Sequence, residues 1–194
     1  LRALGVQPGG RVAVQLAKSP QALAAYGATI AIGAVFLPLN PAYTGAELGY
    51  FLCNATPRVF ICDPARAADL ALIAASHGAR LLSMDGAGCG TLPDLMAQQP
   101  ASFASVTRAP DDLAAILYTS GTTGRSKGAM LTQANLLSNA QTLAQLWRFG
   151  PHDTLLHALP IFHTHGLFVA SNTALVTGGK MIFLPSFEAE TGLR

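Results

Sequence analysis

Short apolar runs alternate with longer segments over residues 1–85. The runs are rich in β-branched residues and follow turn-forming Gly and Pro, which favours strands, whereas the segments between them open with helix-capping residues. We expect strands over 11–17, 35–39, 58–62 and 79–83, and helices from Pro20 to about Ala34, from Thr44 to about Asn54, and over 65–77. This alternation is typical of βαβ units, so the sequence predicts an α/β fold with a mostly parallel sheet flanked by helices.

The pattern changes after residue 85. Residues 86–112 resemble a connecting loop with little periodicity outside 92–97, and the apolar run Leu113 to Leu117 then predicts a strand. Thr132 is expected to cap a long amphipathic helix over 133–147, in which four leucines are available for burial: Leu136, Leu137, Leu143 and Leu146. Beyond it we expect a strand over 154–158, a loop over 159–164, a helix over 166–176 and a strand over 180–184.

Composition adds one constraint. Charged residues make up only 11% of the 194 residues and the mean hydropathy is +0.38, whereas charged residues are about 25% of typical soluble domains. We therefore expect part of this surface to be covered by more protein. The chain also opens at Leu1 without a methionine and stops at Arg194 just after a strand-like run, so we interpret it as a fragment.

Charge and cysteine usage narrow the function class. The net charge is +2, and no basic cluster is interleaved with aromatic residues, so we expect no nucleic-acid partner. The cysteines Cys53, Cys62 and Cys89 are an odd number without Cys-x-x-Cys spacing. This favours buried, reduced thiols in a cytoplasmic protein, with a disulfide or a metal site as the alternative.

One stretch is nearly apolar enough to suggest a membrane span. Residues 22–39 carry no charge, but they contain Gly27 and Gly33, are broken by Pro38, and lack aromatic and basic flanks. A buried helix leading into a buried strand fits better, and residues 1–10 contain no apolar core of a signal peptide. We therefore expect no membrane span.

A loop suited to polyphosphate follows the 113–117 run. The sequence Tyr-Thr-Ser-Gly-Thr-Thr-Gly-Arg-Ser-Lys-Gly over 118–128 combines glycines, hydroxyl side chains and one lysine. Glycine lets backbone N–H groups turn toward an anion, and Lys127 adds a mobile point charge. The spacing excludes the Walker A loop, because Ser126 stands where its second glycine belongs and Gly128 follows Lys127. A surface turn without function is the alternative.

A second polar group of residues lies at Leu-Pro-Ile-Phe-His-Thr-His-Gly over 159–166. Pro160 disfavours helix at the residue before it, so His163 and His165 are expected in a connecting loop that ends at Gly166. Two histidines without a third Cys, His or carboxylate nearby are weak evidence for zinc. Polar loop residues bonded to backbone are the alternative for this stretch taken alone.

Together, in this order, the two patterns resemble the signatures of the adenylate-forming superfamily, which comprises acyl-CoA synthetases, luciferases and peptide-synthetase adenylation domains. One departure is Ser126, where the family usually has Pro. The resemblance implies that residues 1–194 are part of the large N-terminal AMP-binding domain, in three parts (1–85, 86–112 and 113–194), and that the small C-terminal domain is absent. It also implies binding of ATP, with Mg²⁺, and of coenzyme A as co-substrate.

The resemblance also implies residue roles. Around the β- and γ-phosphates it places Ser120, Gly121, Thr122, Thr123, Gly124 and Lys127, with Thr119 supporting the start of the loop. Lys127, Thr122 and His163 are then expected to serve the chemical step, and His163 to line the acyl pocket beside the adenylate. No protein ligand for a metal is expected within this chain.

Residues 162–172 look most like the malonyl-CoA synthetases of that superfamily. The resemblance implies that His165, with His163 and Ser171 in the same pocket, offers hydrogen-bond donors to a second, distal carboxylate. Alternatively, His165 faces solvent and the acid is an ordinary medium- or long-chain fatty acid. The implied reaction joins malonate to coenzyme A through an acyl-adenylate, with release of pyrophosphate and AMP.

Two further alternatives stay open at this stage: a carrier-protein-loading adenylation domain, and a truncated module that binds a ligand without catalysis. In every case the implied partners are a small carboxylic acid, ATP, coenzyme A and the remainder of the same polypeptide. The 194 residues alone are expected to be inactive.

Overall fold

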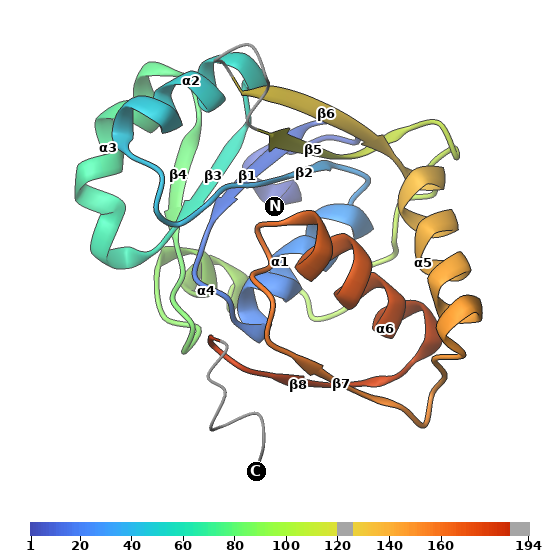
Figure 1. The fold of residues 1–194 in the computed structure, drawn as a ribbon. Coiled ribbons are helices and arrows are strands. Elements are labelled where there is room, and N and C mark those ends of the chain that lie inside the picture. Colours follow the sequence, from blue (N-terminus) through green and yellow to red (C-terminus); the bar gives the residue numbers. More distant parts are fainter. Residues whose placement is uncertain (120–125, 187–194) are drawn as a thin grey trace.

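The structure, a computed structural model, describes residues 1–119 and 126–186 (Figure 1). The strands are β1 (Arg11–Gln15), β2 (Val35–Pro38), β3 (Val59–Cys62), β4 (Arg80–Ser83), β5 (Leu113–Thr119), β6 (Lys127–Thr132), β7 (Thr154–His157) and β8 (Lys180–Phe183). The helices are α1 (Pro20–Ala31), α2 (Gly45–Ala55), α3 (Ala67–Ser76), α4 (Thr91–Met96), α5 (Gln133–Trp147) and α6 (Asn172–Thr177), with 3₁₀ turns at Arg2–Leu4 and Pro64–Arg66 and a π-helix, η3, at His165–Ser171.

The predicted parallel sheet is confirmed. Its strand order is β4-β3-β1-β2-β5-β6, and all pairs are parallel except β5 with β6. A second, two-stranded sheet pairs β7 with β8 in parallel. Strands β1, β2, β3 and β5 of the first sheet are almost entirely buried because helices cover both faces, which explains why they are mostly apolar runs in the sequence.

Two apolar cores lie on opposite faces of the six-stranded sheet. Helices α2 and α3 cover one face, and their buried residues pack with Phe60, Leu37 and Tyr118. On the other face α1, α4, α5 and η3 contribute to a core that contains Tyr26, Phe36 and Ile61 (Figure 1). Alternate residues of one strand enter different cores, as the side-chain period of two requires.

The predicted helix starts are confirmed where capping residues mark them. Ser19 accepts a hydrogen bond from the N–H of Ala22 at α1, and Thr132 forms a capping box with Asn135 at α5. The end predicted for α1 at about Ala34 is wrong by one turn. Gly33, with φ +73°, closes the helix through bonds from its own N–H to Ile30 O and from Ala34 N–H to Thr29 O.

The sequence prediction missed an element after the phosphate loop. We expected a helix to follow it, but strand β6 precedes α5 and pairs with β5 over Lys127 to Thr132. The helix predicted over 166–176 begins as π-helix η3 and continues as α6. Expected burial of the thiols is confirmed for Cys62 and wrong for Cys53 and Cys89, which are exposed; all three are free.

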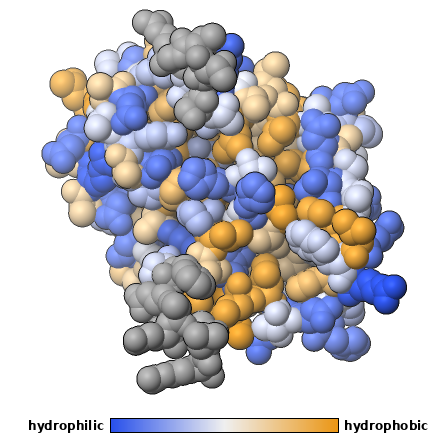
Figure 2. All heavy atoms as spheres, viewed as in Figure 1, coloured by the Kyte–Doolittle hydropathy of each residue, from blue (hydrophilic) through white to orange (hydrophobic). Residues whose placement is uncertain are grey.

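Apolar side chains remain on the surface near α5, α6 and the small sheet. Of the leucines expected to be buried in α5, Leu137 is 50% exposed and Leu146 is 72% exposed. Figure 2 shows apolar residues gathered over α6 and the strands β7 and β8, where Leu156, Leu175, Val176 and Ile182 are exposed. Among the helices of residues 1–119 and 126–186, none combines the length and apolar character needed to cross a bilayer.

Candidate active site

Strands β5 and β6 hold the two ends of the sequence-predicted phosphate loop. Ser120, Gly121, Thr122, Thr123 and Gly124 lie outside the described residues. Thr119 and Lys127 are directly opposite each other in the antiparallel pair, so their side chains project to the same face of the sheet. Lys127 is exposed and begins a strand rather than a helix. Its ammonium is therefore carried on a hydrogen-bonded backbone.

Helix α2 fixes the far end of this loop. The hydroxyl of Tyr50 donates a hydrogen bond to Ser126 O at 2.8 Å, and the hydroxyl of Tyr118 donates to Asn54 Oδ1. The rings of Phe51 and Tyr118 are 4.5 Å apart. Burial raises the pKa of Tyr118, so its hydroxyl keeps the proton that it donates. The loop ends are held by contacts from residues more than 60 positions away in the chain.

Residue 128 is a glycine because neighbouring side chains leave no room for a Cβ. A Cβ there would lie 2.9 Å from Ile116 Cγ2 and 3.3 Å from Tyr118 Cε1. Since atoms at these separations repel, a side chain would push β6 away from β5. The glycine that ends the phosphate-loop pattern therefore allows the two strands to approach closely enough for Lys127 to pair with Thr119.

The second pattern, residues 159–166, lies after β7. Ile161 is buried, and with Phe162 and Leu167 it lines a small cavity whose other walls come from α1 and from β1 and β2 with the residues that follow them: Val14, Leu16, Ala22, Phe36, Pro38 and Leu39. Strand β5 runs parallel to β2, so Thr119 also lies at the carboxyl edge. Ligands of α/β folds bind at this edge of the strands. Both sequence patterns thus meet at the edge where a ligand is expected.

The predicted acyl-pocket residues differ in exposure. His163 and His165 are exposed, and the ring of His163 lies 4.3 Å from that of Phe162. His165 lines a cavity of about 270 Å³ whose other walls are mostly apolar, from Trp147, Phe149, Leu155, Leu159, Val169, Ala170, Thr173 and Ala174. Ser171 is fully buried, and its hydroxyl donates to Gly166 O at 2.8 Å. Its predicted place in the pocket stays a prediction.

Residues 159–166 form the histidine loop, whose last residue, Gly166, lies against its first two, Leu159 and Pro160. A Cβ on Gly166 would lie 2.1 Å from Pro160 O and 3.2 Å from Leu159 O. No side chain fits at that separation, so this backbone contact requires glycine. The π-helix η3 begins at His165, next to the contact. Such wide turns are rare and often occur at functional sites.

A site for a bound metal was also considered. Within residues 1–119 and 126–186, no three His, Cys, Asp or Glu side chains come close enough to hold an ion. The expected association of Mg²⁺ with ATP stays a prediction.

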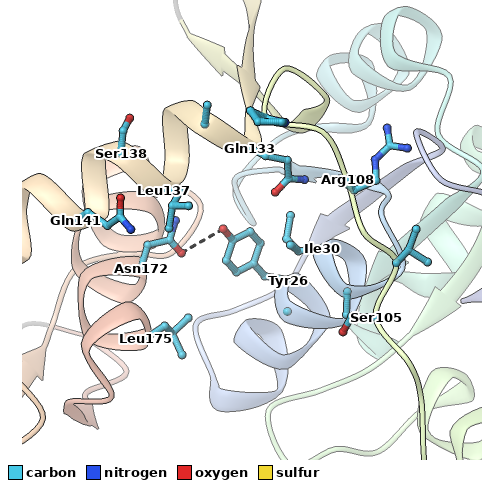
Figure 3. A pocket seen from close by; sticks show the side chains of 15 residues that line it. Tyr26, Ile30, Ser105, Arg108, Gln133, Leu137, Ser138, Gln141, Asn172 and Leu175 are labelled. Atoms are coloured by element: carbon cyan, nitrogen blue, oxygen red, sulfur yellow. Dashed lines mark hydrogen bonds between the residues drawn. The ribbon is translucent and has the colours of Figure 1, made fainter.

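A wide cavity elsewhere in the described residues contains none of the predicted site residues. Its volume is about 780 Å³, and α1, α5, α6 and the segment 105–110 form its walls (Figure 3). Tyr26 donates to Asn172 Oδ1 at 3.1 Å, and burial raises its pKa to about 12. Arg108 pairs with Asp112 at 3.1 Å. These two pairs leave Gln133 Nε2, on the same wall, buried without a hydrogen-bond partner in residues 1–119 and 126–186.

Two contacts near the site were not predicted from the sequence. Tyr50 is separated from Ser126 by 76 positions, and nothing in the local pattern signals that bond. His157 follows two leucines at the end of β7 and is 1% exposed. The available signal in the sequence was a histidine that follows two leucines in a predicted strand, because a polar group in a buried strand needs a partner.

The comparisons with known proteins agree with this geometry. The AMP-binding enzyme family profile matches residues 1–193. ATP-bound MatB from Rhodopseudomonas palustris superposes with a TM-score of 0.96 at 54% identity, covering 100% of this chain and 38% of MatB. A feruloyl-CoA synthase from Amycolatopsis sp. is 34% identical, covering 97% of this chain and 36% of the synthase.

The malonate–CoA ligase of Arabidopsis thaliana is 31% identical, covering 94% of this chain and 30% of the ligase. The chain thus spans between 30% and 38% of the length of these three proteins. The predicted superfamily and its α/β fold are confirmed by the matched profile and the superposition. The chain belongs to the AMP-binding enzyme family.

Proposed function

We propose that this chain is the N-terminal part of an ATP-dependent acid–CoA ligase whose acid is malonate. The observation that carries the proposal is the meeting of both sequence patterns at the carboxyl edge of β1, β2 and β5. One pattern is suited to phosphates and the other to a small acid, which are the two substrates of the first step. The ATP complex of MatB, similar over the whole of this chain, supports the nucleotide assignment.

In the proposed reaction a carboxylate oxygen attacks the α-phosphorus of ATP, the bond to pyrophosphate breaks, and an acyl-adenylate forms. The sulfur of coenzyme A then attacks the acyl carbon and AMP leaves. The difficulty is electrostatic, since an anion approaches a polyanion and charge grows on the leaving pyrophosphate. Lys127 and the loop of 119–124 would stabilise that charge with the lysine ammonium and with hydroxyl and backbone donors.

The histidine loop would receive the acid. His163 and His165 are exposed at its surface, so both imidazoles are available as donors to a carboxylate. We assign His163 to the wall near the reacting carboxylate and His165 to the distal carboxylate of malonate. Similarity to the Arabidopsis malonate–CoA ligase supports this acid. In the proposed pocket, buried Ser171 supports the loop rather than contacting the acid, because its hydroxyl donates to Gly166 O.

One observation favours a second candidate, a ligase for a larger apolar acid. The cavity of about 270 Å³ beside His165 is lined mainly by Trp147, Phe149, Leu155 and Leu159 with other apolar groups. Such walls suit an acyl or aromatic chain better than a carboxylate. Similarity to the feruloyl-CoA synthase points the same way.

The remainder of the same polypeptide is the proposed partner of the apolar surface. The exposed residues of α5, α6, β7 and β8 would be covered by the part that the longer relatives possess. We accordingly expect residues 1–194 alone to show no turnover.

The test is ATP–pyrophosphate exchange by the complete polypeptide that contains this chain. Malonate, methylmalonate, acetate, octanoate and ferulate are compared, in the wild type and in His165→Leu. We expect exchange to be greatest with malonate and to fall for malonate alone in the variant. Greatest exchange with octanoate or ferulate would keep the ligase and replace the acid. No exchange with any acid would refute the proposed reaction.

A further inference from the structure

The side chain of His157 contacts two residues of η3, Gly166 and Ser171. It is the last residue of β7, and its Nε2 lies 2.8 Å from Gly166 O and 3.0 Å from Ser171 Oγ. Ser171 Oγ is itself 2.8 Å from Gly166 O. His157 and Ser171 are both almost completely buried. Two side chains thus bond to the carbonyl of the second residue of η3.

The partners determine the tautomer of this histidine. A carbonyl oxygen only accepts, so Nε2 carries the proton that it shares with Gly166 O, and the Ser171 hydroxyl gives its own proton to the same oxygen. Nδ1 is then an unprotonated, buried atom, and it has no partner within residues 1–119 and 126–186. Protonating Nδ1 would bury a charge without an acceptor. The ring is therefore a neutral donor.

The positive charge of Lys18 also favours the neutral form of His157. Lys18 Nζ donates to the backbone carbonyl of His157 and lies 5.0 Å from the centre of the Phe183 ring. Burial lowers the pKa of Lys18 to about 8, so the ammonium is mostly protonated at neutral pH. Burial lowers the pKa of His157, the bond to Gly166 O opposes this, and the charge of Lys18 lowers it further.

His157 is itself held in place from two sides. Its ring lies 4.7 Å from that of Phe183 on the neighbouring strand β8. Its carbonyl is bonded to Lys18, which follows β1 in the main sheet. The donor at Nε2 therefore has a fixed position relative to the edge where the two patterns meet. Such outer contacts keep site residues close to their productive geometry.

We propose that His157 is a positioning residue for the acid-binding loop: by bonding Gly166 O it fixes the end of the segment that carries His163 and His165. The segment closes on itself where Gly166 approaches Pro160 O, so holding Gly166 fixes both ends. His157 reaches the substrate through this loop rather than by contact. The inference rests on the proposed ligase function, which gives the loop its role.

The test compares His157→Leu with His157→Gln in the complete polypeptide. Leucine removes the donor and leaves Gly166 O with one side-chain partner, whereas the glutamine amide supplies an N–H. We expect His157→Leu to lower the kcat of pyrophosphate exchange by about 10²-fold, the usual effect of a displacement near 1 Å, and to raise the KM for the acid. The KM for ATP should not change, because β5 and β6 hold the phosphate loop. His157→Gln should recover most of the lost kcat.

A matched control separates positioning from general destabilisation. Leu70 is 1% exposed in α3, on the opposite face of the main sheet, and Leu70→Ala should lower stability without lowering kcat per folded molecule. Equal losses of kcat in Leu70→Ala and His157→Leu would overturn the proposal, as would a wild-type kcat in folded His157→Leu. Failure of His157→Gln to recover any activity would also count against it.

Hydrogen–deuterium exchange distinguishes this inference from the proposed function. In His157→Leu, amides of 160–171 should exchange faster while those of 113–119 stay protected. If the wild type activates no acid, the ligase proposal fails, and faster exchange confined to 160–171 still supports the positioning of the loop. Unchanged exchange in that segment would refute the positioning, whatever the activity.

Discussion

Gly166→Ala tests the central geometric claim about the histidine loop. The added Cβ would lie 2.1 Å from Pro160 O, whereas ordinary contacts begin at 3.4 Å, so the two backbone segments must separate by about 1 Å. Pro160 has a fixed φ and resists this movement. The separation would also disturb the bonds from His157 and Ser171 to Gly166 O.

The magnitude follows from two contributions. Overpacking of a tight contact costs about 1–3 kcal/mol, and a weakened hydrogen bond costs about 1 kcal/mol. We expect the free energy of local opening of residues 160–171 to fall by roughly 2–4 kcal/mol, which speeds amide exchange in that segment by about 30- to 1000-fold. Pyrophosphate exchange should fall in the same variant, because His163 and His165 lie within the displaced loop.

Gly27→Ala is the matched control. Gly27 lies inside α1, is exposed, and has no atom within 4 Å of the position that a Cβ would take. Alanine should stabilise that helix by about 0.5–1 kcal/mol, and amide exchange over 160–171 should not change. If Gly166→Ala matched the wild type in both amide exchange and activity, the close approach to Pro160 would be refuted.

Three further predictions concern the phosphate loop and pH. Lys127→Ala should weaken the use of ATP by about 1–3 kcal/mol, a rise in the KM for ATP of roughly 5- to 150-fold, and an unchanged KM would remove Lys127 from the site. Tyr50→Phe removes the bond to Ser126 O, so the KM for ATP should rise by roughly 2- to 10-fold, while a rise in the KM for the acid alone would contradict the anchoring role. The lowered pKa of His157 means that the unfolded chain binds its proton more readily, so the contribution of His157 to stability should be constant above about pH 6.5 and fall as the pH drops below it. Urea unfolding at pH 7.5 and 5.5 should show a larger loss for the wild type than for His157→Gln, and equal losses would contradict the assignment.

Local sequence determined much of the fold. Runs such as Leu113 to Leu117 are apolar because both faces of their strand are buried. Such a strand can be recognised from its own consecutive residues. Caps such as Ser19 and Thr132 act within three residues, so their helix starts could be predicted. The two patterns at 118–128 and 159–166 were visible for the same reason: their residues are consecutive.

Other features depend on residues that are distant in the chain. Strand β6 begins at exposed residues and owes its conformation to pairing with β5, so the sequence pattern over 127–132 gave no strand signal. The apolar face of α5 predicted burial, but Leu137 and Leu146 find no cover within the described residues. Hydrophobic periodicity shows which face seeks a partner, and only the tertiary structure shows whether one is present.

The candidate site divides in the same way. The sequence by itself determined which side chains are available, because Lys127, His163 and His165 belong to continuous patterns. Tertiary structure alone decided that both patterns lie at one edge of the sheet, that Tyr50 and His157 hold them, and that Gly166 must lack a side chain against Pro160. These contacts join residues that only the packing of the strands brings together, so they cannot be predicted from the composition of a local segment.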